Sequence, residues 1–109
     1  TQHLLDAKQL AFLPKDAALI NAGRGSLLDE DALLNLLNQQ HLRFVLLDVF
    51  ATEPLPAAHP FWRHPAVIIT PHVAADTIPE EAVAQISANI QALASGHPVQ
   101  GQVDRQRGY

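Results

Sequence analysis

Residues 17–48 read AALINAGRGSLLDEDALLNLLNQQHLRFVLLD, and this stretch decides the fold class. It opens on a short apolar run at 17–20 and closes on a second at 44–47, each as long as a buried strand. Between them, Leu33, Leu34 and Leu37 mark the apolar face of a helix that begins with a run of acidic residues. Strand, helix and strand in this order predict two parallel strands joined by a helical crossover.

Elements of the same kind flank this central unit. Residues 5–13 are expected to form a short helix with Asp6 as its N-cap. A loop with four prolines follows at 48–65, where proline prevents any long helix or central strand. Residues 67–69 are β-branched throughout and are expected to form a third strand.

The last element is a helix expected over 79–94. Thr77 and Glu80 have the spacing of a capping box, and Gly96 suits the position just beyond the helix end. Apolar residues recur at spacings of three and four and predict one apolar stripe along this helix, formed by Val83, Ile86, Ile90 and Leu93.

Apolar strands that alternate with helices indicate an α/β chain with a parallel sheet whose strands, such as 44–47, are buried on both faces. Three strands make half of a doubly wound sheet, so the other strands are expected in sequence outside these residues. The chain opens on Thr1 and contains no methionine, which we interpret as a sign that it is a piece of a longer parent.

Composition excludes several classes of function. The 109 residues are 48% hydrophobic, enough for a packed core, and they include no cysteine, which fits a cytoplasmic protein. The net charge is −4 and there is no basic stripe, so we expect no nucleic-acid partner. The apolar runs are too short to span a bilayer, so we expect no membrane partner either.

Polar residues follow each predicted strand, where ligands bind in open parallel sheets. Arg24 comes after the first strand, Asp48 and Glu53 after the second, and His72 after the third. Arginine can hold a carboxylate with a planar fork of donors, and histidine can exchange a proton near neutral pH. A carboxylate beside the histidine favours its charged form. Together these residue types predict a site for the reduction of a 2-oxo acid, with an electron source still to be supplied.

Three motifs in this order resemble the C-terminal signatures of the D-isomer-specific 2-hydroxyacid dehydrogenases. They are NAGRG at 21–25, LDVFATEPLP at 47–56 and TPHVAA at 70–75, and HPFW at 59–62 also resembles the family pattern. The ending VDRQRGY at 103–109 resembles the glyoxylate/hydroxypyruvate reductase A branch of that family.

The resemblance implies the C-terminal half of a Rossmann-type doubly wound parallel sheet. Residues 1–78 would belong to the nucleotide-binding domain, and 79–109 would be a closing helix and tail that return to the substrate domain. The glycine-rich phosphate turn of the family would lie upstream, so the chain alone is expected to be inactive. The parent would be a homodimer that reduces glyoxylate or hydroxypyruvate with NADPH or NADH, and the branch favours NADPH.

The resemblance also implies a role for each matching residue. Arg24 would bind the carboxylate and carbonyl oxygen of the substrate, and His72 would be the general acid of the reduction. Glu53 would pair with His72 and favour its charged form. The predicted cofactor-binding residues are Ala22, Asp48 and Ala74, with Asp48 near the nicotinamide carboxamide.

Two other functions are compatible with parts of the pattern. Related scaffolds serve as dinucleotide-sensing corepressors, and these can keep the same three catalytic residues. A metal-assisted hydrolase could use His59, His64, Asp48 and Glu53, but the spacing matches no known metal motif and we expect no metal site. Simpler readings also exist: Asp48 could merely cap a loop, and His72 could be a buried core histidine.

Overall fold

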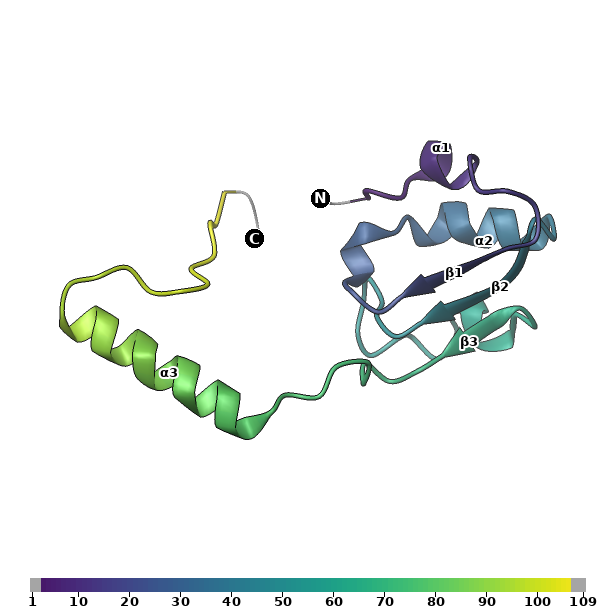
Figure 1. The fold of residues 1–109 in the computed structure, drawn as a ribbon. Coiled ribbons are helices and arrows are strands. Elements are labelled where there is room, and N and C mark those ends of the chain that lie inside the picture. Colours follow the sequence, from purple (N-terminus) through teal and green to yellow (C-terminus); the bar gives the residue numbers. More distant parts are fainter. Residues whose placement is uncertain (1–2, 107–109) are drawn as a thin grey trace. The chain divides into compact units, whose positions relative to one another are not determined.

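The computed structural model describes residues 3–106, which form two compact units divided between Ala75 and Asp76. The helices and strands of the first unit are α1 (Ala7–Leu10), β1 (Ala17–Asn21), α2 (Glu30–Asn38), β2 (Leu42–Leu47) and β3 (Val67–Ile69), with short 3-10 helices η1 (Gly25–Leu27) and η2 (Pro60–Arg63) (Figure 1). The second unit contains α3 (Pro79–Ala94). Assignment of 1–78 and 79–109 to different domains of a parent stays a prediction, and residues 107–109 of the C-terminal motif lie outside the described residues.

The three strands of the first unit form one parallel sheet in the order β1-β2-β3, as predicted. Asn21 at the end of β1 pairs with Leu47 at the end of β2, and Leu47 pairs with Ile69 at the end of β3. The three strands therefore end in register, and the loops that follow them begin at one common edge of the sheet.

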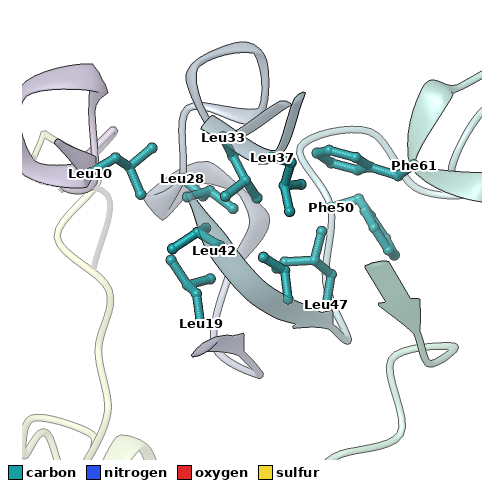
Figure 2. Packing of buried hydrophobic residues seen from close by; sticks show 10 residues of the cluster. Leu10, Leu19, Leu28, Leu33, Leu37, Leu42, Leu47, Phe50 and Phe61 are labelled. Atoms are coloured by element: carbon teal, nitrogen blue, oxygen red, sulfur yellow. The ribbon is translucent and has the colours of Figure 1, made fainter. Parts of the chain in front are cut away.

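The core lies between the sheet and α2, which covers one of its faces (Figure 1). Figure 2 shows Leu33 and Leu37 of α2 pointing toward the strand that carries Leu42 and Leu47, and all four side chains are buried. On the other face Ile20 and Ile68 are exposed, while Phe44 and Leu46 are only partly buried. The prediction that residues 44–47 are buried on both faces is therefore wrong for this chain, because within the first unit helices cover a single face.

Acidic N-caps start the first two helices. Asp6 accepts hydrogen bonds from the backbone N–H groups of Lys8 and Gln9, at 2.8 and 3.0 Å, as its predicted role requires. The helix is shorter than the expected 5–13 at both ends: Leu5 forms an isolated parallel bridge with Leu28, and Ala11 is already the C-cap. Asp29 caps α2 in the same way, accepting from the N–H of Ala32 at 2.9 Å.

The second unit confirms the predicted bounds of its helix but not the predicted cap. Ile78 is the N-cap of α3 and its side chain makes no capping hydrogen bond, so the capping box expected from Thr77 is wrong. Pro79 occupies the first turn, where its missing N–H leaves one donor fewer to satisfy. Gly96 follows the helix with φ +71° and donates its N–H to the carbonyl of Leu93, as expected of a C-terminal glycine.

The apolar stripe of α3 is exposed in the described unit, with Val83, Ile86, Ile90 and Leu93 each more than half accessible. Within residues 3–106, no helix has the length and apolar character needed to cross a membrane.

Candidate active site

The loop after β1 carries Arg24 and is fixed by the side chain of Asn21. The amide oxygen of Asn21 accepts from the N–H of Gly23 at 3.1 Å, and its amide nitrogen donates to the carbonyl of Arg24 at 3.1 Å. Asn21 is itself buried, so the loop turns around an internal polar anchor. The Nη1 atom of Arg24 donates to the carbonyl of Gly23 at 2.8 Å, and the side chain stays exposed.

The same loop packs closely against the chain that follows β2. A Cβ atom placed on Gly25 would lie 1.9 Å from the carbonyl carbon of Phe50 and 2.4 Å from the nitrogen of Ala51. Only glycine allows two backbones to approach so closely. This contact brings the Arg24 loop beside the loop that carries Glu53.

Two carboxylates hold the loop after β2. The N–H of Phe50 donates to Oε1 of Glu53 at 2.9 Å, within the loop itself. The N–H of Ala51 donates to Oε1 of Glu30 at 2.8 Å, which ties the loop to the start of α2. The Oε1 atom of Glu53 thus fixes the side chain to its own loop, which leaves Oε2 for a partner outside the loop.

That second oxygen meets the predicted general acid. The Nδ1 atom of His72 lies 2.8 Å from Oε2 of Glu53, and the two side chains are 53% and 37% exposed. A half-exposed imidazole is not a core histidine, so the simpler reading of His72 does not hold. Within the described residues the Nε2 atom of His72 makes no hydrogen bond, which leaves it available to a ligand.

All three predicted catalytic residues line one cavity. Arg24, Glu53 and His72 border a hollow of about 330 Å³ together with the backbone around Phe50. A second cavity, of about 550 Å³, lies against the same Glu53–His72 pair. Its other walls are mostly apolar and are formed by Phe50, Pro54, Leu55, Trp62, Ile69 and Pro71, with Asp48 and Thr70. The Glu53–His72 pair therefore borders both cavities.

Asp48 lies at the base of this arrangement and is 1% exposed. Its Oδ1 atom accepts from the hydroxyl of Thr70 at 2.5 Å and from the N–H of Val73 at 3.0 Å, and its Oδ2 atom accepts from the N–H of Ala74 at 2.9 Å. The hydrogen bond from Thr70, followed by that from Val73, lowers the pKa of Asp48 against the opposing effect of burial. Asp48 is thus held as a buried anion.

The three predicted cofactor-binding residues occupy the same edge of the sheet. Asp48 and Ala74 are joined directly by the hydrogen bond just described. Ala22 is exposed and follows Asn21, whose carbonyl accepts the N–H of Asp48 at 2.9 Å. Their role in holding a cofactor stays a prediction, but their shared location at the strand ends is established.

Three further residues, Asn21, Glu30 and Thr70, shape the site without having been predicted as site residues. Asn21 could have been found, since asparagine at the start of a glycine-containing loop often bonds its own backbone. Glu30 and Thr70 gave no such signal, because their partners Ala51 and Asp48 lie 21 and 22 residues away. Such contacts follow from how the loops pack and not from any local spacing.

Acid is expected to weaken the Glu53–His72 pair. The hydrogen bond with His72, followed by that from the N–H of Phe50, lowers the pKa of Glu53 in the folded chain. A carboxylate with a lowered folded pKa stabilises the fold above its unfolded pKa, about 4.3, and this contribution is lost as the pH falls further. Urea unfolding followed by the fluorescence of Trp62, the sole tryptophan, should show stability falling more steeply between about pH 5 and pH 3 in the wild type than in Glu53→Gln. Parallel curves would contradict this prediction.

Comparison with known proteins identifies the family to which the chain belongs. Residues 1–74 match the model of the D-isomer specific 2-hydroxyacid dehydrogenase, NAD binding domain. The chain belongs to this family, and the match to its NAD-binding domain confirms the prediction of a nicotinamide dinucleotide as cofactor.

Relatives agree over the whole chain. It is 53% identical over all 109 residues to glyoxylate/hydroxypyruvate reductase A of Serratia proteamaculans, but spans only 35% of that protein. A 2-hydroxyacid dehydrogenase from Xanthobacter autotrophicus, solved with NADPH and MES, is 45% identical and superposes with a TM-score of 0.89 over 100% of this chain and 45% of its own. An NADPH-dependent glyoxylate/hydroxypyruvate reductase from Sinorhizobium meliloti, solved with NADP and sulfate, is 35% identical with a TM-score of 0.83 over 100% of this chain and 36% of its own. The chain thus spans about a third of the curated relatives it matches.

Proposed function

We propose that this chain provides the substrate-binding arginine, Arg24, and the proton donor, His72, of an enzyme that reduces small 2-oxo acids with NADPH or NADH. Glyoxylate and hydroxypyruvate are the proposed substrates, in keeping with the names of the Serratia and Sinorhizobium relatives. The observation that supports this most directly is the 2.8 Å contact between His72 and Glu53 on the wall of the cavity that Arg24 also lines. A homodimeric assembly and a cytoplasmic location remain predictions.

The three side chains divide the work of the reduction. Arg24 binds the carboxylate and the carbonyl oxygen of the 2-oxo acid, since its guanidinium offers five donors in a fixed plane. Glu53 orients the His72 ring through its hydrogen bond with Nδ1. The Nε2 proton of His72 is then transferred to the carbonyl oxygen, which becomes the hydroxyl group of the product.

The strand ends fit a nicotinamide as hydride source. The carbonyl carbon of the substrate must gain a hydride while its oxygen gains the proton, and a reduced nicotinamide supplies that hydride when bound. Among residues 3–106, Oδ2 of Asp48 accepts a hydrogen bond from Ala74 alone, and so keeps a lone pair for a carboxamide N–H. Ala22 is exposed and follows Asn21, whose carbonyl accepts the N–H of Asp48, so its backbone is proposed as a further contact for the cofactor. No described feature favours the corepressor alternative, and within residues 3–106 no cluster of His, Asp and Glu could hold a metal ion.

A chimeric enzyme tests the proposal. The matching segment of the Serratia proteamaculans reductase is replaced by residues 1–109 of this chain, so that Arg24, Glu53 and His72 come from this sequence. The oxidation of NADPH and of NADH is followed at 340 nm (the absorbance of the reduced nicotinamide) with glyoxylate and with hydroxypyruvate. Turnover by the chimera, with none by the isolated chain, supports the proposal. A correctly folded chimera that is inert toward 2-oxo acids contradicts it.

Replacing Arg24 with lysine in this chimera should weaken recognition of the substrate carboxylate. Lysine keeps the charge but loses the planar fork, so kcat/KM for glyoxylate should fall by about 10- to 100-fold, in line with about 1.5–3 kcal/mol for a hydrogen bond to a charged group. Steady-state kinetics measure the effect. Arg43→Lys is the matched control, because Arg43 lies at the start of β2, away from the strand ends that carry the site. Equal kinetics for the two variants would remove Arg24 from the substrate site.

A further inference from the structure

A buried carboxylate holds the segment that carries His72 from both sides. The hydroxyl of Thr70 donates to Asp48 from two residues before His72, and the N–H groups of Val73 and Ala74 donate to it from the two residues after. Thr70 is also anchored by its backbone, because its N–H donates to the carbonyl of Leu47 at 3.0 Å. The Asp48 carboxylate thus bridges the end of β2 to both flanks of the proposed acid.

The backbone at His72 needs such support. Its φ is +55°, in the left-handed region that L-residues other than glycine rarely adopt. A residue persists there only when surrounding contacts fix it. In this conformation Nδ1 of His72 faces Glu53 at 2.8 Å, so the strained turn and the orientation of the ring go together.

We propose that Thr70 is a positioning residue for His72, acting through its hydrogen bond to the Asp48 carboxylate. The inference rests on the proposed function of His72 as the proton donor. The hydroxyl fixes the rotamer of the buried carboxylate, and an oriented carboxylate holds the N–H groups of Val73 and Ala74 in place. The Thr70 bond is also the largest cause that lowers the pKa of Asp48, so it helps to keep this acceptor ionised despite its burial.

Two substitutions isolate the hydroxyl. Thr70→Val keeps the branched shape and the backbone bond to Leu47 but removes the donor. Thr70→Ser restores a hydroxyl on the same Cβ. Thr77→Val makes the same chemical change at an exposed position in the second unit and serves as the matched control.

In the Serratia chimera, Thr70→Val is expected to lower kcat by about 10- to 100-fold, because a misplacement of about 1 Å can cost about 10²-fold in rate. KM for glyoxylate should change by less than about twofold, since Arg24 is untouched. Thr70→Ser should recover most of the lost kcat, and Thr77→Val should match the wild type.

The His72 ring gives a second readout in the same protein that does not depend on turnover. With ¹⁵N-histidine labelling and assignment by His72→Asn, the Nδ1 resonance should report the bond to Glu53 in the wild type and in Thr70→Ser. It should shift or broaden in Thr70→Val.

The outcomes separate this inference from the proposed function. An inert wild-type chimera whose Nδ1 signal still depends on the Thr70 hydroxyl refutes the dehydrogenase proposal but supports the positioning of His72. An active chimera in which Thr70→Val matches the wild type in kcat and in the Nδ1 signal overturns the inference. So does a rise confined to the KM of the nucleotide, which would assign the Thr70–Asp48 pair to cofactor binding alone.

Discussion

Replacing His72 with asparagine in the Serratia chimera is expected to lower kcat for glyoxylate by about 10²- to 10⁴-fold, the range typical of losing a general acid. Asparagine cannot donate the proton, yet among residues other than glycine it is one of the best suited to the left-handed backbone that His72 adopts at φ +55°. The loss should therefore report chemistry and not a relaxed loop. Initial rates of NADPH oxidation at saturating glyoxylate measure it.

The control for this variant is His97→Asn, the same exchange at an exposed histidine beyond α3. It is expected to keep the wild-type rate. Glu53→Gln should lie between the two, because glutamine can still accept a hydrogen bond from Nδ1 of His72 but places no negative charge beside the ring. Full activity of His72→Asn would leave the proposed mechanism without its proton donor.

The single methyl group added by Gly25→Ala is expected to reduce activity to an extent similar to His72→Asn. The added Cβ would lie 1.9 Å from the carbonyl carbon of Phe50, 2.0 Å from its oxygen and 2.4 Å from the nitrogen of Ala51. These are backbone atoms, so one of the two loops must move. The N–H of Phe50 binds Glu53, and the N–H of Ala51 binds Glu30. Movement of the loop after β2 should therefore displace Glu53 from His72, and movement of the Arg24 loop should displace Arg24 from the Glu53–His72 pair.

For Gly25→Ala we expect kcat/KM to fall by about 10²-fold or more, as displacements of about 1 Å can do. The free energy of unfolding should fall by about 1–3 kcal/mol, the usual cost of forcing extra volume into a packed contact. Kinetics of the chimera and urea unfolding followed by Trp62 fluorescence measure the two effects. Gly23→Ala is the matched control, because its Cβ would meet only ordinary contacts at 3.5 Å from Leu27 and 3.6 Å from Asn21. Equal losses in both variants would show that the close approach at Gly25 is not the cause.

The sequence alone was sufficient for the order and nature of the main elements. Hydrophobic periodicity is a local property, so the three strands and α3 could be located from runs and spacings, and Asp6 could be recognised as a cap. Parallel strands direct their carboxyl ends to one edge of the sheet, so the sequence predicts that Arg24, Glu53 and His72 lie close together. The cavity that all three line bears out that expectation.

Tertiary structure alone decided how these residues are held. The Gly25–Phe50 approach, the bond from Ala51 to Glu30 and that from Thr70 to Asp48 join residues more than twenty positions apart. No spacing rule predicts such pairs, because they depend on how separate loops pack against each other over the strand ends. The burial of β2 on one face instead of two was decided in the same way. A local pattern specifies which face is apolar, but only the assembled chain determines what covers it.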